Sequence, residues 1–301
     1  MLHPAIPEKR RRSRFIPKVL LLLGVVGLII YTGRNVYYAS SHKNADVLVL
    51  GHAGSGFFSP LNPFNPLPPN SRASIIKALE EHGADGVELD VQLSRDGVPV
   101  LYHDITLATM TVRQEPDTIE NLDASDVVGL AYKGGFPYDL FQNEKIITLE
   151  EVLQLFGTYP ELPYLHIDLR NHDTSRYAYY AQTLMALLRQ YNYPVRKLAF
   201  ISPNPDLLQA FREEEPAAVL IIDSAENHEQ TVQLILERGF QGICANGGDM
   251  SAEQVQQAKQ QGLLVVLFGG KSNARISRMI STGADAIQVN DVAAMRRMLG
   301  E

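Results

Sequence analysis

Residues 86–104 read Gly-Val-Glu-Leu-Asp-Val-Gln-Leu-Ser-Arg-Asp-Gly-Val-Pro-Val-Leu-Tyr-His-Asp. The first half alternates apolar and polar residues, which predicts a strand with Glu88 and Asp90 on one face. The strand rise places these two carboxylates about 7 Å apart along the chain. A turn and a second strand then end at His103 and Asp104. Two acids and an imidazole could form a metal and proton-transfer site, although a half-exposed hairpin is the plainer interpretation of this stretch alone.

The N-terminal segment differs in composition from the rest of the chain. Six Lys and Arg residues between positions 9 and 18 precede residues 19–30, which are apolar apart from glycines. This run is short for a full span and suits the core of a signal sequence, but with tilt and flanking arginines it could still cross a membrane. Only a weak cleavage site follows, at Ala39-Ser40-Ser41. We therefore expect a single-pass anchor with a cytoplasmic N-terminus, and a cleaved signal peptide is the alternative.

Charge supports a division of the chain at about residue 45. Residues 1–45 carry a net charge of +7, and because the whole chain is at −7, residues 46–301 carry −14. An acidic domain argues against nucleic-acid binding, but it can accept an anionic substrate if a metal supplies positive charge. The lone Cys244 excludes an intramolecular disulfide, and nothing in the sequence predicts the oligomeric state. The expected parts are a basic cytoplasmic segment at 1–18, a transmembrane anchor or uncleaved signal at 19–38, a linker at 39–45 and a single domain at 46–301.

Strand and helix candidates alternate along that domain. Amphipathic helices separate short apolar strands, which predicts βαβ units and a parallel sheet. A domain of about 255 residues with roughly eight repeats favours a closed (β/α)8 TIM barrel over a doubly wound sheet. One of nine strand candidates must then be an edge piece, and we expect it to be the one at 218 or at 242. The candidates begin near residues 47, 87, 98, 163, 198, 218, 242, 263 and 286.

The candidate functional residues all lie at the predicted C-terminal ends of strands, where barrels of this kind carry their chemistry. Three carboxylates from two strands are hard oxygen ligands suited to Mg²⁺ or Ca²⁺. Two histidines on different strands can act as general base and general acid. With no suitable Ser or Cys nucleophile, this combination points to phosphodiester cleavage, and a zinc site would need a tighter His/Cys cluster. The residues concerned are His52, Glu88, Asp90, His103 and Asp168.

Several motifs resemble the glycerophosphodiester phosphodiesterase family. The resemblance runs from about residue 46 to 300, and the part between 83 and 104 is the most specific. It implies a TIM barrel that hydrolyses glycerophosphodiesters to glycerol 3-phosphate and an alcohol with a divalent metal. The metal ligands and the acid/base histidines that it implies are the five residues named above. The motifs are Gly51-His52-x-Gly, Gly83-Ala84-Asp85-Gly86-Val87-Glu88-Leu89-Asp90-Val91, Asp96-Gly97-Val98-Pro99-Val100-Leu101-Tyr102-His103-Asp104, Ile147-Thr148-Leu149-Glu150-Glu151-Val152-Leu153 and Asp168-x-Arg170.

The chain departs from the family pattern at several positions. The family has an Arg after its first His, where this chain has Ala53, and the Glu of a Glu-Asn-Thr motif is replaced at Pro69. Loss of the Arg would remove a bidentate phosphate contact, for which Arg170 or Lys271 is the candidate replacement. His166 shares a strand face with Asp168 but lies deeper, so we expect a core histidine there.

Three hypotheses follow for the activity. The first is metal-dependent hydrolysis of small-molecule or lipid-derived phosphodiesters at the membrane. The second is a phospholipase-like reaction that stops at a cyclic phosphate, and the third is a degenerate barrel that binds a phosphate ligand without turnover. A long polar segment at 105–147 is expected to contribute to function, because loops of this length are uncommon in compact domains.

Overall fold

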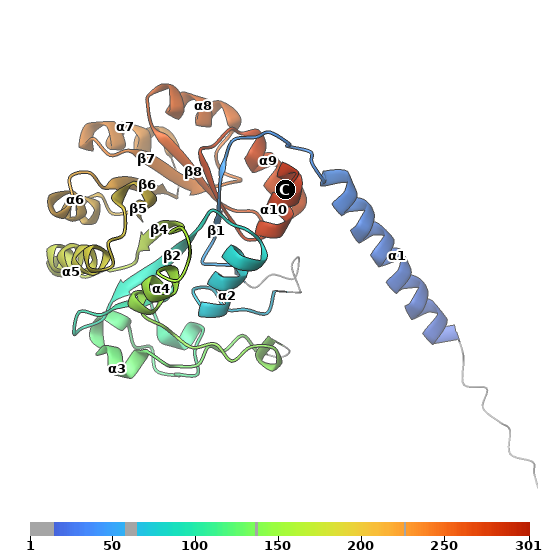
Figure 1. Ribbon diagram of the computed structural model, residues 1–301, viewed down its shortest axis with the longest axis horizontal. Coiled ribbons are helices and arrows are strands. Elements are labelled where there is room, and N and C mark those ends of the chain that lie inside the picture. The colour runs from blue at the N-terminus through green and yellow to red at the C-terminus, as the bar shows by residue number, and fades with distance from the viewer. Residues whose placement is uncertain (1–14, 58–64, 136–137, 226) are drawn as a thin grey trace, which may run out of the picture.

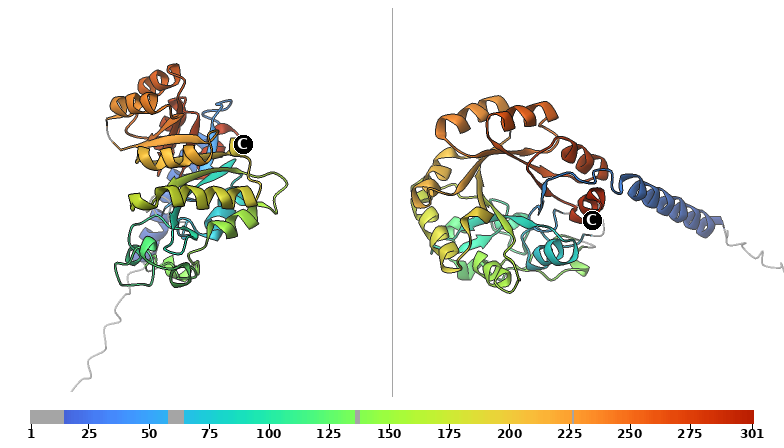
Figure 2. Two further views of the ribbon diagram at one scale, coloured as in Figure 1. Left: turned by 90° about the vertical axis from the view of Figure 1, so that its left-hand side faces the viewer. Right: turned by 45° about the horizontal axis from the view of Figure 1, so that its top comes forward.

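Eight parallel strands form a closed barrel with helices around it (Figures 1 and 2). The computed structural model describes residues 15–57, 65–135, 138–225 and 227–301. Strand β1 pairs in parallel with both β2 and β9, which closes the ring. The predicted TIM barrel is therefore confirmed. The barrel strands are β1 (Leu48–Gly51), β2 (Gly86–Leu93), β4 (Tyr164–Leu169), β5 (Leu198–Ser202), β6 (Val219–Ser224), β7 (Gly242–Asn246), β8 (Leu264–Gly269) and β9 (Ala286–Val289).

The one described strand that is not part of the ring is β3 (Pro99–Leu101). It pairs antiparallel with β2 and lies outside the barrel. Our expectation that the strand at 218 or at 242 is the extra one is therefore wrong, because β6 and β7 both belong to the ring. The physical reason is the connection between β2 and β3. A turn closed by Gly97, with φ of +88°, is far shorter than the crossover that a parallel neighbour requires.

Helices cover the outside of the ring, as the right-hand view of Figure 2 shows. The capping box predicted at Thr148 and Glu151 is present at the start of α4, and Asn204 caps α6, whose first residue is Pro205. These caps satisfy backbone N–H groups at the helix starts. The helices after the first strand are α2 (Arg72–Ile76), continued by a π-helix η1 (Lys77–Glu81), then α3 (Ala124–Val127), α4 (Leu149–Phe156), α5 (Tyr177–Gln190), α6 (Pro205–Glu214), α7 (His228–Arg238), α8 (Ala252–Gln260), α9 (Asn273–Ser281) and α10 (Val292–Leu299).

The core has two layers. The larger lies between strands and helices, and the smaller fills the inside of the barrel with Leu50, Ala199, Ile201, Ile221, Cys244, Val266 and Ala286. Because the strands are buried on both faces, they read as almost continuous apolar runs. Polar side chains begin where the inner apolar layer ends, towards the C-terminal ends of the strands. The fold therefore gathers them at one mouth of the barrel.

The segment at 105–147 folds on the outside of β3 around its own small apolar cluster, which includes Val100, Tyr102 and Tyr132. It contains α3 and three short 3₁₀ turns, η2 (Leu107–Thr109), η3 (Ile119–Asn121) and η4 (Tyr138–Leu140). Two further 3₁₀ turns, η5 (Thr174–Arg176) and η6 (Val195–Lys197), precede α5 and β5.

An isolated helix, α1 (Phe15–Tyr38), precedes the barrel and runs away from it (Figure 1). Residues 18–38 have a mean hydropathy of 1.9, and this helix is long and apolar enough to cross a membrane. Its C-terminal end meets the barrel, where Asn273 Nδ2 donates to Asn35 Oδ1 at 3.2 Å. Most of the basic segment predicted at 1–18 lies outside the described residues, which begin at 15.

Candidate active site at the barrel mouth

Three carboxylates meet inside the barrel mouth. Glu88 and Asp90 come from β2, and Asp168 comes from β4, in register with Asp90 on the neighbouring strand. All three side chains are buried. One oxygen from each lies within 4.8 Å of the others, so the structure brings together the three predicted metal ligands.

Burial and mutual repulsion shape the charge of this cluster. Burial, followed by the charges of Asp90 and Asp168, raises the pKa of Glu88 well above its usual range. Burial also raises the pKa of Asp168 to about 7, although the Arg170 guanidinium opposes that shift. Asp168 Oδ1 is buried without a hydrogen-bond partner among the described residues. A buried carboxylate cluster short of positive charge, with an unsatisfied oxygen, fits a divalent cation bound by oxygen ligands.

Arg170 is the cation in contact with this cluster. Its Nε donates to Asp90 Oδ1 at 3.0 Å and its Nη2 to Asp168 Oδ2 at 2.6 Å. Burial disfavours the charged guanidinium, but Asp90 and Asp168 more than offset this and raise the pKa of Arg170. A guanidinium carries five N–H donors, so those not used by the carboxylates remain for a ligand at the mouth.

His52 follows β1 directly and lies beside the carboxylates. Its Nδ1 is 2.9 Å from Asn290 Oδ1, and its Nε2 is 3.8 Å from Glu88 Oε2. Burial lowers the pKa of His52 to about 4, so the ring is neutral at neutral pH. In the tautomer that donates from Nδ1 to Asn290, Nε2 is the basic atom.

His103 follows β3, so it reaches the mouth from the hairpin and not from a barrel strand. Its Nδ1 lies 2.8 Å from Asp104 Oδ1. Burial lowers the pKa of His103, but its hydrogen bond to the Asp104 carboxylate and the charge of Asp90 outweigh that effect, and the net pKa is raised. The two predicted acid/base histidines therefore differ in charge preference.

Phe57 lies between the two histidines. Its ring centroid is 5.0 Å from that of His52 and 5.0 Å from that of His103, in edge-to-face geometry. Phe268 packs on His52 from another direction, with centroids 5.6 Å apart. Aromatic rings therefore border the two histidines at the mouth. Phe57 was not predicted from the sequence, because it sits in a proline-rich loop without periodicity.

Ala53, which departs from the family pattern, and Asn70, which follows the replaced Pro69, support the carboxylates. The Ala53 N–H donates to Glu88 Oε2 at 2.8 Å. Asn70 contacts Asp90 twice, since its Nδ2 donates to Asp90 Oδ2 at 2.7 Å and its Oδ1 accepts from the Asp90 N–H at 3.0 Å. Both hold the carboxylates in place, and neither role is readable from residue type alone.

Lys271 and His166, the remaining residues considered in the sequence, differ in their surroundings. Lys271 is exposed in the loop after β8, and within the described part of the chain its side chain makes no hydrogen bond or ion pair. His166 is buried with Nδ1 3.1 Å from Gln288 Nε2, as expected of a core histidine. Asp223, near the end of β6, was not predicted from the sequence. Its charge contributes to the raised pKa of Asp168 and of Arg170. It could have been found as an acidic residue at the end of a predicted strand.

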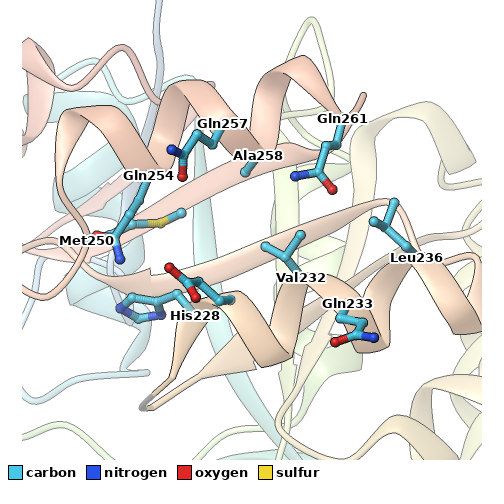
Figure 3. Close-up of a pocket in the computed structure, with 10 residues that line it drawn as sticks. His228, Val232, Gln233, Leu236, Met250, Gln254, Gln257, Ala258 and Gln261 are labelled. Atoms are coloured by element: carbon cyan, nitrogen blue, oxygen red, sulfur yellow. The ribbon is translucent and has the colours of Figure 1, made fainter.

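A separate groove of about 270 Å³ lies between α7 and α8 on the outside of the barrel (Figure 3). Its histidine, His228, is satisfied by Ser224 Oγ at 2.8 Å and by the Asp249 carbonyl at 3.1 Å. None of the described carboxylates and histidines of the barrel mouth lines this groove. The candidate site residues are therefore all at the mouth and not in this groove.

Comparison with known proteins identifies related sequences and structures. The profile of the glycerophosphoryl diester phosphodiesterase family matches residues 62–294. Glycerophosphocholine phosphodiesterase gde1 of Schizosaccharomyces pombe is 26% identical over 332 residues, 87% of this chain and 29% of that protein. A glycerophosphodiester phosphodiesterase of Caldanaerobacter subterraneus subsp. tengcongensis is 30% identical over 152 residues, 50% of this chain and 55% of that protein. This chain thus spans less than two thirds of either relative.

A solved structure shares the fold. The phosphodiesterase of Oleispira antarctica in complex with sn-glycerol-3-phosphate superposes with a TM-score of 0.70 at 22% identity. The match covers 84% of this chain and 96% of that chain. It extends over the barrel and confirms the architecture.

Proposed function

The chain belongs to the glycerophosphoryl diester phosphodiesterase family, and on that premise we propose that it hydrolyses glycerophosphodiesters to glycerol 3-phosphate and an alcohol. The observation that carries the proposal is the buried cluster of Glu88, Asp90 and Asp168 beside two histidines of opposite charge preference. We assign the three carboxylates as ligands of a divalent metal, Mg²⁺ or Ca²⁺.

The metal site is supported by the chemistry of the donor set. Glu88, Asp90 and Asp168 would hold the ion, and the unsatisfied Asp168 Oδ1 offers it a free ligand atom. When bound, a divalent ion polarises a phosphoryl oxygen and offsets its developing charge. The Ala53 N–H and the Asn70 amide each hold one carboxylate in place, Glu88 and Asp90 respectively. Such supporting contacts are part of how a metal site is preorganised.

The two histidines divide the proton transfers. His52 is neutral at neutral pH, so its Nε2 accepts the proton of the attacking water. His103, whose pKa is raised, carries a proton that it donates to the oxygen of the departing alcohol. Pairs of titratable groups with pKa values pushed apart are the usual basis of acid/base catalysis at neutral pH. Asn290 orients the ring of His52 through its contact with His52 Nδ1, and Asp104 orients the ring of His103 through its contact with His103 Nδ1.

Arg170 is the candidate phosphate contact in place of the missing family Arg. Its guanidinium is held at the mouth by Asp90 and Asp168, with other N–H groups left over. The Ala53 side chain is fully buried, so position 53 contributes through its backbone. Lys271 is a second candidate, placed in the exposed loop after β8.

The N-terminal helix supports a location at a membrane. We assign α1 as a single-pass anchor with the N-terminus in the cytoplasm and the barrel outside it. The basic residues that precede the apolar run favour this orientation. Lipid-derived phosphodiesters and small glycerophosphodiesters are then the substrate classes, and no nucleic acid is expected.

The test is release of glycerol 3-phosphate from glycerophosphocholine by the full chain in detergent. EDTA should abolish release and Mg²⁺ or Ca²⁺ should restore it. His52→Ala should abolish it as well, whereas His82→Ala, in the turn after η1 and away from the mouth, should retain it. Turnover that persists in His52→Ala would remove the role given to His52.

Two other outcomes would select the competing hypotheses. A cyclic phosphate that accumulates without ¹⁸O from labelled water would indicate a phospholipase-like reaction. Calorimetric binding of glycerophosphocholine without product after long incubation would indicate a binding protein.

A further inference from the structure

The tip of the segment at 105–147 exposes apolar side chains. Leu140 is 69% exposed and Phe141 68% exposed. Seven large apolar residues described after α1 are exposed, and four of them lie in this segment. These four are Leu140, Phe141, Ile105 and Val112. Single exposed apolar residues are ordinary, but the adjacent pair Leu140 and Phe141 at the tip is a candidate interaction surface.

The charged groups around the tip are balanced in sign. Lys133 and Lys145 flank it, and both are exposed and without an ion pair among the described residues. The acids of the tip are engaged internally. Asp139 accepts from the N–H groups of Gly134 and Gly135 at 2.7 and 3.0 Å, and Glu144 accepts from the Ala73 N–H at 3.0 Å. These carboxylates keep their charge and offset the two lysines, so the exposed apolar pair Leu140 and Phe141 is what distinguishes the tip.

The tip lies on the side of the barrel from which α1 runs. In Figure 1 and in the right-hand view of Figure 2, the light-green turn η4 and the blue helix α1 both lie on the right-hand side of the barrel. The contact of Glu144 with the start of α2 also ties the tip to the rim of the catalytic mouth. The segment begins directly after His103 and Asp104, so the tip and the site share one structural unit.

We propose that Leu140 and Phe141 dock on the surface of a phospholipid bilayer, the same bilayer that α1 crosses. The inference rests on the anchor assigned under the proposed function. Two apolar side chains bind a bilayer only weakly by themselves. Tethering by α1 turns that contact into an intramolecular one, so a weak contact is sufficient. Docking would hold the barrel mouth at the interface where phosphodiesters that keep an acyl chain are found.

The location of the tip can be measured with a fluorescent probe. Leu140→Cys and, as a matched control, the exposed Leu236→Cys on α7 are labelled in the full chain with an environment-sensitive dye, since native Cys244 is buried. Each protein is reconstituted into vesicles of phosphatidylcholine with phosphatidylserine. The probe at 140 should be quenched by spin-labelled lipid and shielded from iodide, and the probe at 236 should show the reverse. Equal iodide access at the two positions would overturn the proposal.

A functional readout separates docking from catalysis. The double variant Leu140→Glu with Phe141→Glu should raise KM for a vesicle-embedded lysophospholipid by about tenfold, because the tethered contact is lost. Its kcat/KM for soluble glycerophosphocholine should stay within about twofold of wild type, because the change lies outside the site. Equal loss on both substrates, or no loss on either, would contradict docking.

The outcomes also distinguish this inference from the ones on which it rests. A chain that does not float with vesicles would overturn both the anchor and the docking surface. A chain that floats with a shielded tip but does not hydrolyse glycerophosphocholine would overturn the proposed activity and leave the docking surface in place.

Discussion

His52 and His103 carry the same side chain, yet their surroundings set different protonation states. His52 is enclosed at the end of β1, and burial lowers its pKa to about 4. His103 is more open, and its hydrogen bond to Asp104 favours the charged ring. Residue type and strand-end position suggested two acid/base groups. Which is the base and which the acid depends on burial and neighbours, and these belong to the folded structure.

The Asp104 contact gives a prediction for the pH profile. Asp104→Asn removes the charged hydrogen-bond partner that raises the pKa of His103, so that pKa should fall. A general acid works only while protonated, and the alkaline limb of the kcat/KM profile should therefore move to lower pH. The measurement is kcat/KM for glycerophosphocholine across pH. Asp117→Asn, whose partner is Arg113 on the outer segment, should leave the profile in place. An unmoved alkaline limb in Asp104→Asn would refute His103 as the acid.

Asn70 gives a prediction for stability and metal binding. Asn70→Ala leaves the Asp90 N–H and one carboxylate oxygen unpaired in a buried site, which costs about 1–3 kcal/mol. The free energy of unfolding should fall by that amount in urea denaturation. Loss of a contact that orients a ligand should also weaken metal affinity by about 10–100-fold. The exposed Asn143→Ala serves as control, and an effect of equal size there would contradict the assignment.

The hairpin of β2 and β3 is the element that brings His103 to the mouth. The eight barrel strands are parallel, and a histidine on one of them would be part of the ring that carries the carboxylates. The antiparallel β3 instead returns along the outside of β2 and directs His103 toward the mouth from beside it. The sequence indicated both strands and the turn, but the pairing direction decides from which side the imidazole arrives.

The turn of this hairpin gives a prediction at the level of the element. Gly97 has a φ of +88°, and a Cβ there would meet the hydroxyl of Tyr179. Gly97→Ala should lower the free energy of unfolding by about 1–2 kcal/mol, the cost of a left-handed conformation for a residue with a side chain. Because the hairpin positions His103, kcat should fall as well. Thermal unfolding and steady-state kinetics report the two effects.

Gly157, the C-cap of α4, is the matched control. Its φ is −62°, and the nearest atom to an added Cβ is 3.4 Å away. Gly157→Ala should therefore be neutral or should stabilise the fold by about 0.4–1 kcal/mol, through the reduced entropy of the unfolded chain. Similar losses in both variants would mean that backbone conformation at Gly97 is not the cause.

At the scale of the whole molecule, α1 stands apart from the domain that it precedes. Its large apolar side chains from Leu20 to Tyr37 are exposed, and burial in a bilayer would remove them from water. The full chain should therefore remain in the membrane fraction after extraction at alkaline pH. Leu23→Arg with Val26→Arg should release it, because each Arg at the centre of a span costs about 2.5–3.5 kcal/mol. Tyr37→Arg, near the end of the helix, should stay bound, and release of all three proteins alike would contradict the anchor.

Patterns local in sequence predicted most of the fold. Apolar strands and amphipathic helices of regular length indicated the barrel, and Thr148 with Glu151 indicated the start of α4. The extra strand was assigned to the wrong place, because alternation of residue types does not distinguish a parallel strand from an antiparallel one. The short connection between β2 and β3 does distinguish them, because it allows only an antiparallel pair.

The sequence by itself determined the closed barrel, the apolar N-terminal helix and the residues that carry the candidate chemistry. The reason is that period and residue type act over a few neighbouring positions. Only the tertiary structure decided that Arg170 pairs with Asp90 and Asp168, that Phe57 lies between the two histidines, and that Ala53 serves through its backbone N–H. These depend on contacts between strands and loops far apart in the chain, and no local pattern encodes such distances.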